Sequence, residues 1–138
     1  MMVGQCLCGE IRISVRAHAD AVSACHCSLC RTWSGTIWMG LEAAPDAVTV
    51  EGTPRSYRSS SFAERAFCPT CGTQLWLRDD DGPYELMPGL FPGSKSIPLT
   101  REVYADRTFA WAALAGEHTR VSATEYERKY PFVEGDQP

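Results

Sequence analysis

Cys25-His26-Cys27-Ser28-Leu29-Cys30 places three thiols within six residues, and no other cysteine lies nearby in the chain. In an extended segment, side chains at alternate positions point the same way, and a tight turn over two residues returns the third sulfur to the other two. Such a group of thiolates favours a soft cation, and zinc prefers sulfur and a tetrahedral shell. Because three protein ligands leave one position for water or substrate, the stretch predicts a reactive metal site rather than a purely structural one.

The other four cysteines form two pairs, Cys6 with Cys8 and Cys68 with Cys71. A closed tetrahedral zinc site takes four ligands, so the two pairs together can supply one all-cysteine site that stabilises folding. If the middle triplet borrowed one of these cysteines, the partner of that cysteine would be left without a site. Gly72 follows the last cysteine, where a metal-binding turn often needs a positive φ. The sequence therefore predicts a structural site of four cysteines and an open site of three.

The middle triplet has a second interpretation, a structural zinc completed by a histidine or a carboxylate. The candidate histidines are His18, His26 and His118. His26 lies between two of the cysteines, and in an extended segment it points away from both sulfurs, which makes it a poor fourth ligand. The open site and the closed site both remain possible at this point.

Length and charge limit the classes of protein to consider. The chain has 138 residues, a net charge of -4 and a pI near 5.3. We expect a single zinc-binding domain over residues 1–138, and the acidic balance argues against a nucleic acid or an anionic membrane as partner. The start of the chain lacks a signal sequence, and no stretch is long enough to span a membrane. We therefore expect a cytoplasmic location, and in a reducing compartment the seven cysteines, which cannot all pair, are better candidates for metal ligands than for disulfides.

Periodicity predicts a mainly β protein with one short C-terminal helix. Residues 10–16 alternate between apolar and polar side chains, as expected for a strand with one buried face. Further strands are predicted at 36–41, 48–52, 53–58, 73–78 and 84–87, with an ordered loop at 88–98. Ser122 and Glu125 match a capping box, so a helix should follow to Lys129 and end before Pro131. The tail after Phe132 should fray.

Two other groups of residues have simple structural explanations. The four tryptophans are expected in the core, and the three consecutive aspartates are expected in a solvated turn. These residues are Trp33, Trp38, Trp76 and Trp111, and Asp79 to Asp81.

The order of the cysteine motifs resembles the glutathione-dependent formaldehyde-activating enzyme (GFA) family, which also includes centromere protein V. The matching motifs are Gly4-x-Cys6-x-Cys8-Gly9, Cys25-His26-Cys27-x-x-Cys30-Arg31 and Arg65-x-Phe67-Cys68-x-x-Cys71-Gly72. The resemblance covers residues 4 to about 78 and implies a β-tent of antiparallel sheets with two Zn²⁺ ions. It implies a structural zinc on Cys6, Cys8, Cys68 and Cys71, and a catalytic zinc on Cys25, Cys27 and Cys30.

The resemblance also implies the addition of glutathione to formaldehyde, which gives S-hydroxymethylglutathione and is a carbon–sulfur lyase reaction in reverse. A zinc ion with an open position can bind a thiol and lower its pKa beside a carbonyl carbon. Glutathione carries two carboxylates, so its pocket should contain basic side chains. The predicted thiol-binding residues are Arg31 and Arg65, and Arg55 and Arg58 are also near the metal motifs. A non-catalytic zinc module that binds a small thiol or a protein partner is the alternative, and the oligomeric state is left open.

Overall fold

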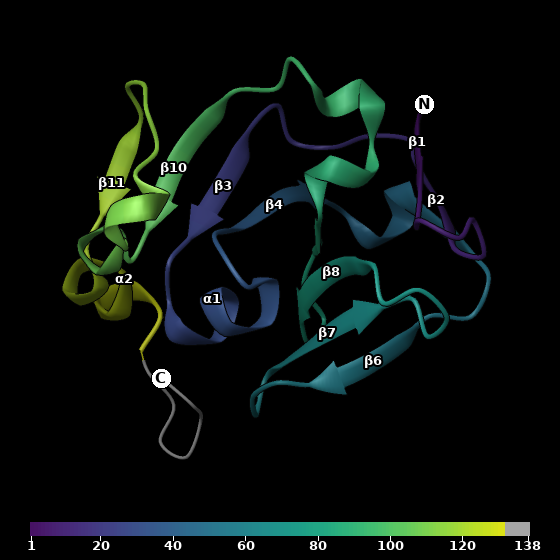
Figure 1. Ribbon diagram of the computed structural model, residues 1–138, viewed down its shortest axis with the longest axis horizontal. Helices are drawn as coiled ribbons and strands as arrows, with labels where there is room; N and C mark the ends of the chain where they lie inside the picture. Colours follow the sequence, from purple (N-terminus) through teal and green to yellow (C-terminus); the bar gives the residue numbers. More distant parts are fainter. Residues whose placement is uncertain (132–138) are drawn as a thin grey trace.

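The computed structural model of the chain describes residues 1–131, and the tail expected to fray after Phe132 lies outside them. The chain forms two sheets, of three and eight strands (Figure 1). The three-stranded sheet has the order β1 (Met2–Gln5), β2 (Arg12–Val15) and β5 (Val48–Glu51). The eight-stranded sheet has the order β11 (Thr119–Val121), β10 (Leu99–Val103), β3 (Val22–Cys25), β4 (Trp38–Ala43), β9 (Tyr84–Leu86), β8 (Gln74–Asp79), β7 (Ala63–Phe67) and β6 (Arg55–Arg58).

The main hydrophobic core joins the two sheets. Alternate residues of β2, Ile13 and Val15, are fully buried, as the alternation in the sequence predicted. They belong to one cluster with Leu41 on β4 and Leu86 on β9. The central strands of the large sheet thus give side chains to this core, whereas the edge strand β6 is exposed.

The pairing of the strands confirms the mainly β fold, with one departure from an all-antiparallel arrangement. All ladders of the small sheet are antiparallel. In the large sheet, the neighbouring strands in the spatial order β3-β4-β9-β8-β7-β6 also pair antiparallel. β10 pairs in parallel with both β3 and β11. Strands predicted at 48–52, 53–58, 73–78 and 84–87 correspond to β5, β6, β8 and β9. β1, β3, β7, β10 and β11 were not predicted, because these segments are short and lack a clean alternation.

Two α-helices are present in the described residues, and only the second was predicted. α2 (Ala123–Lys129) begins as expected, because Ser122 Oγ accepts a hydrogen bond of 3.2 Å from the Glu125 N–H. α1 (Ser28–Ser34) occupies the segment that we expected to be extended or turned. Cys27 is its N-cap, and Gly35 ends it with φ of 78°, a value that suits glycine. The cysteine triplet is therefore a strand–helix junction.

The remaining segments are ordered turns. Residues 88–98 form a loop, as predicted, and this loop contains two short 3-10 helices. Trp38 and Trp76 are buried, but Trp111 is 63 % exposed, because it lies in a 3-10 turn outside the sheets and packs on Phe109. Between residues 1 and 131, no helix is long and apolar enough to cross a membrane.

Candidate functional site

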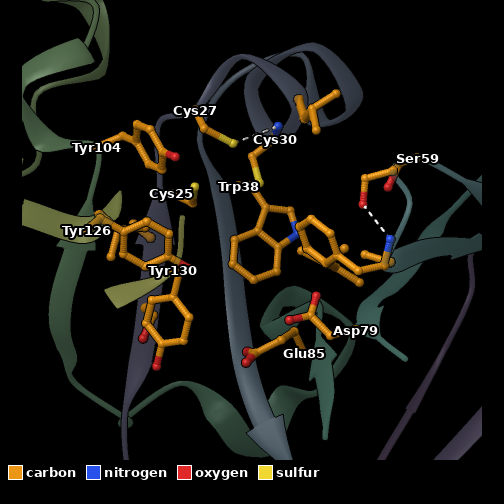
Figure 2. A pocket seen from close by; sticks show the side chains of 18 of the residues that line it. Cys25, Cys27, Cys30, Trp38, Ser59, Asp79, Glu85, Tyr104, Tyr126 and Tyr130 are labelled. Atoms are coloured by element: carbon orange, nitrogen blue, oxygen red, sulfur yellow. Dashed lines mark hydrogen bonds between the residues drawn. The ribbon is translucent and has the colours of Figure 1, made fainter. Parts of the chain in front are cut away.

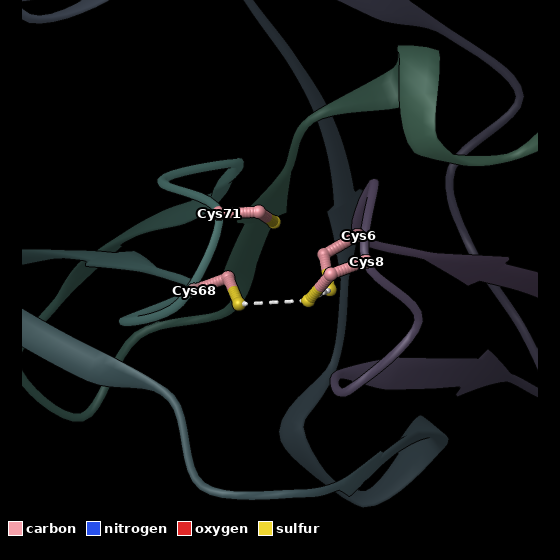
Figure 3. A group of neighbouring side chains, drawn as sticks. All are labelled: Cys6, Cys8, Cys68 and Cys71. Carbon is pink, nitrogen blue, oxygen red and sulfur yellow. Dashed lines mark hydrogen bonds between the residues drawn. The ribbon is translucent and has the colours of Figure 1, made fainter.

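Four cysteine sulfurs meet where two distant turns come together. Cys6 and Cys8 lie in the turn after β1, and Cys68 and Cys71 lie in the turn between β7 and β8 (Figure 3). All four sulfurs lie within 4.8 Å of one another. Cys8 Sγ is 3.5 Å from Cys6 Sγ and 3.7 Å from Cys68 Sγ. We call these residues the four-sulfur group.

The four-sulfur group fits a tetrahedral zinc ion. With zinc–sulfur bonds of about 2.3 Å, tetrahedral geometry places the sulfurs about 3.8 Å apart, close to the separations observed here. The hydroxyl and the backbone N–H of Thr73 lower the pKa of the Cys71 thiol to about 5, which favours the thiolate that binds metal. Gly72 has a φ of 76°, as predicted for the residue after the last cysteine. The donor set is therefore complete for one closed site.

The other three cysteines gather at the junction of β3 and α1. Cys25 ends β3, Cys27 caps α1 and Cys30 lies in the first turn of the helix, with all three sulfurs within 4.8 Å of one another. Hydrogen bonds with Cys25 and Cys30 lower the pKa of the Cys27 thiol to about 2. The same contact with Cys27 raises the pKa of Cys25, so this contact favours the thiolate of Cys27 over that of Cys25. We call these residues the three-sulfur group.

A buried arginine places positive charge beside these sulfurs. The side chain of Arg65 comes from β7, is only 4 % exposed, and has Nη1 and Nη2 each 3.7 Å from Cys30 Sγ. Its guanidinium also lies 5.2 Å from the centre of the Trp33 ring. Its Nε has no hydrogen-bond partner in the described chain. Arg65 can therefore stabilise negative charge on the three-sulfur group or on a ligand beside it.

The histidines are bound elsewhere. His26 Nε2 lies 2.7 Å from Glu102 Oε1, and His118 contacts the other oxygen of the same carboxylate. His18 contacts a backbone carbonyl oxygen. Within residues 1–131, no histidine or carboxylate ligand atom joins the three sulfurs within 4.8 Å. The prediction that His26 points away from the sulfurs is confirmed, and the closed alternative finds no fourth ligand in this part of the chain.

A cavity of about 600 Å³ adjoins the three-sulfur group, and all three of its cysteines lie in the wall (Figure 2). One face of the large sheet forms the floor. Register explains this, because Cys25 on β3 is opposite Trp38 on β4, and Leu77 on β8 is opposite both Arg65 and Glu85. Side chains directly opposite each other share a face, so residues far apart in sequence line one space.

The charged residues of this cavity differ from those predicted. Arg65 lines it, whereas Arg31 lies 4.4 Å over the Phe109 ring and donates a hydrogen bond to the His26 carbonyl. Arg101 and Arg107 line the cavity but were not predicted. Arg55 and Arg58 lie on the exposed strand β6, outside the cavity wall.

Four acidic residues also line the cavity: Glu42, Asp79 and Glu85 on the large sheet, and Glu127 on α2. Asp79 is exposed and its carbonyl oxygen accepts a hydrogen bond from the Gly82 N–H, as expected for a solvated turn, but it is also the last residue of β8 and lines the cavity, which was not predicted. The sequence signal that was missed is alternation, because Leu77 and Asp79 share one face of the strand that follows the last cysteine pair, whereas Trp76 belongs to the main core.

Tyr104 has an unusual backbone conformation at the edge of the cavity. Its φ of 55° is in the left-handed region, which is rare for a residue with a large side chain. Its hydroxyl donates a 3.2 Å hydrogen bond to Glu127 Oε1 on α2. Figure 2 shows this hydroxyl directed towards the side of the cavity that holds Cys25 and Cys27. The strained turn after β10 thus places a hydroxyl near the three-sulfur group.

Comparisons with known proteins establish the family. Residues 1–107 match the family model of the glutathione-dependent formaldehyde-activating enzyme. An uncharacterized lyase of Schizosaccharomyces pombe is 35 % identical over 106 residues, which cover 75 % of this chain and 77 % of the relative. A putative glutathione-dependent formaldehyde-activating enzyme of Halomonas elongata is 31 % identical over 93 residues, 60 % of this chain and 59 % of the relative. The chain belongs to the glutathione-dependent formaldehyde-activating enzyme family.

The fold is also found in a solved structure. A crystal structure of a Rhodobacter sphaeroides protein aligns with a TM-score of 0.58 and 25 % identity, covering 72 % of this chain and 100 % of the other. The family predicted from the cysteine motifs is confirmed, and the predicted class of enzyme, a lyase, agrees with the names of the relatives.

Proposed function

We propose that this protein is a zinc-dependent carbon–sulfur lyase that forms or cleaves the adduct of a glutathione-like thiol with formaldehyde or a related small aldehyde. One observation carries this proposal. The three-sulfur group lies in the wall of a cavity of about 600 Å³, a volume typical of small-molecule sites. The four-sulfur group, in contrast, has a complete tetrahedral donor set.

The two groups have different proposed roles. Cys6, Cys8, Cys68 and Cys71 hold a structural zinc, and Cys25, Cys27 and Cys30 hold a catalytic zinc. When bound at three cysteines, zinc supplies a position for a thiol and lowers the pKa of that thiol. Arg65 contributes a fixed positive charge beside Cys30, which favours an anionic sulfur in the cavity.

Two further arginines suit the carboxylates of a glutathione-like thiol. Arg101 and Arg107 line the cavity, and neither forms an ion pair within residues 1–131. Their guanidinium groups lie over aromatic rings, Arg101 over Tyr126 at 5.8 Å and Arg107 over Tyr104 at 5.2 Å. A guanidinium held in this way can bind a carboxylate through two hydrogen bonds. These residues therefore take, with Arg65, the role predicted for basic side chains.

The proposed reaction forms one C–S bond and transfers one proton. The ionised thiol gives a sulfur electron pair to the carbonyl carbon, the C–S bond forms, and the π electrons of the C=O bond move to oxygen. That oxygen takes up the proton that the thiol released, and the reverse steps cleave the adduct. The hydroxyl of Tyr104 lies near the three-sulfur group, and in this proposal it turns from Glu127 Oε1 to donate its hydrogen bond to this oxygen.

We also propose a cytoplasmic location, supported by the seven cysteines, all of which are free thiols.

A direct test combines binding and turnover. Calorimetry of glutathione in buffers of different ionisation enthalpy should show release of about one proton per thiol, because a free thiol has a pKa of about 8.5. NMR exchange spectroscopy should show faster exchange between formaldehyde and S-hydroxymethylglutathione with the enzyme than without it. Cys27→Ser should remove both effects. Proton release without faster exchange would favour the non-catalytic, thiol-binding module.

A further inference from the structure

The end of the cavity formed by β4, β8 and β9 is acidic. Glu42 on β4 is directly opposite Glu85 on β9, so the two carboxylates share one face of the sheet. Asp79, at the end of β8, lines the same end of the cavity. Like charges directly opposite each other in a sheet are unfavourable, and a cation between them removes the repulsion. Burial raises the pKa of Glu85 to about 7, and the charges of Glu42 and Asp79 raise it further.

The described residues place no cation in direct contact with these carboxylates, although the charge of Arg65 acts on Asp79 from a greater distance. In the part of the chain that the structure describes, Glu42, Asp79 and Glu85 form neither an ion pair nor a side-chain hydrogen bond. The remaining residues, 132–138, have the sequence FVEGDQP, which contains no lysine, arginine or histidine. The acidic end of the cavity is therefore suited to a cationic group of a bound molecule.

Trp38 gives an independent indication of a ligand at the same place. Its side chain is only 5 % exposed, it lines the cavity, and its Nε1 has no hydrogen-bond partner in the described chain. An indole N–H can only donate, so this group suits an oxygen of a ligand. Figure 2 shows the indole between the sulfur of Cys30 and the carboxylates of Asp79 and Glu85.

Gly40 holds the indole next to Glu85. A Cβ atom at Gly40 would lie 2.2 Å from Cη2 of Trp38 and 3.0 Å from Oε2 of Glu85. The ring therefore lies across the strand at a position that only glycine permits, and its edge adjoins the carboxylate. An aromatic face beside carboxylates is the environment that an ammonium group prefers.

We infer that the acidic end binds the ammonium group of the thiol substrate, with Glu85 and Asp79 as its partners and an oxygen of the same molecule at Trp38 Nε1. This inference rests on the proposed function, because it assumes that the thiol of the same molecule lies at the three-sulfur group. It narrows the substrate class to thiols with a free amine remote from the sulfur, such as the γ-glutamyl end of glutathione. A thiol without that amine leaves the carboxylates unpaired and is disfavoured.

The test compares glutathione with glutathione acetylated on its α-amine, measured by calorimetry on the zinc-loaded protein. Acetylation should weaken binding to the wild type about tenfold, the loss expected for one charge-assisted hydrogen bond. Glu85→Gln should weaken the binding of glutathione to a similar extent but should leave the affinity for the acetylated thiol nearly unchanged. Glu51→Gln removes the same charge from the exposed edge strand β5 and should change neither affinity.

The outcomes separate this inference from the proposed function. If both thiols bind the wild type equally, or if Glu85→Gln weakens both equally, the inference is overturned and the thiol site stands. If neither thiol binds the zinc-loaded wild type, the proposed function fails and the inference fails with it. The wild-type comparison is decisive even if Glu85→Gln folds poorly.

Discussion

The four-sulfur group and the three-sulfur group use the same ligand atoms in different surroundings. The first joins turns that are some 60 residues apart, as in the 3.7 Å contact of Cys8 with Cys68. The second lies within one strand–helix junction, from Cys25 to Cys30. A cross-link between distant segments removes much of the entropy of the unfolded chain, whereas a local one removes little. The difference supports the proposal that the first group serves folding and the second serves binding.

The largest expected effect is on folding, from Cys68→Ala. Cys68 is fully buried, and its loss leaves three thiolates around a metal site that is coupled to folding. We expect a loss of about 4 kcal/mol or more in the free energy of unfolding, measured by urea denaturation with zinc present. A loss below about 1 kcal/mol would contradict a structural role for the four-sulfur group.

Cys27 should matter much less for folding. Its sulfur accepts the N–H of Cys30 at 3.5 Å as the cap of α1, so Cys27→Ala should cost about 1 kcal/mol. Cys27→Ser keeps a capping oxygen and should restore most of that stability, while it still removes a soft metal ligand. Thermal melts and metal analysis of both variants check this. If Cys27→Ser were as unstable as Cys68→Ala, the distinction between the groups would fail.

Tyr104 tests whether the cavity beside the three-sulfur group is catalytic. Tyr104→Phe keeps the ring but removes the hydroxyl bound to Glu127. We expect about a tenfold to hundredfold slower exchange of formaldehyde with its thiol adduct, and nearly unchanged thiol affinity. NMR exchange rates and calorimetry measure the two quantities. Unchanged exchange would remove Tyr104 from the reaction, and equal losses of rate and affinity would assign it to binding.

The smallest expected effect is a gain in stability from Glu85→Gln. Because the pKa of Glu85 is raised from 4.5 to about 7, the folded state binds its proton more tightly than the unfolded chain does. The wild type therefore loses stability as the pH rises from 4.5 through 7, and the variant lacks this loss. Denaturation at pH 4 and pH 8 should show little difference at pH 4 and a gain on the order of 1 kcal/mol at pH 8. A gain in stability at pH 4 alone would contradict the predicted direction of the pH dependence.

The sequence predicted the grouping of the cysteines because the members of each pair and of the triplet are close in sequence, so that local turns bring their sulfurs together. It missed α1, because cysteine is an unusual N-cap residue and Cys25 to Cys30 also suits an extended segment with a turn. The helix could have been found from Gly35, which follows Arg31-Thr32-Trp33-Ser34 at the position of a C-terminal cap.

The cavity was less predictable, because strand register creates it. Glu42 and Glu85 are opposite each other although they are 43 residues apart in the sequence, and neither has a motif around it. Arg101 reaches the cavity because β10 pairs in parallel with β3, a pairing that local patterns do not specify. The grouping of the candidate metal ligands was therefore visible in the sequence, whereas the charged residues proposed to select a substrate required the sheet.

Graded chelation of the wild-type protein tests the division between the groups most directly. We predict two zinc ions per chain, with the ion of the three-sulfur group lost first, because that group has three protein ligands rather than four. The first equivalent should leave without unfolding and should abolish glutathione binding, and the second should leave only as the protein unfolds. A single release phase of one equivalent, or glutathione binding that survives loss of the first ion, would contradict this account.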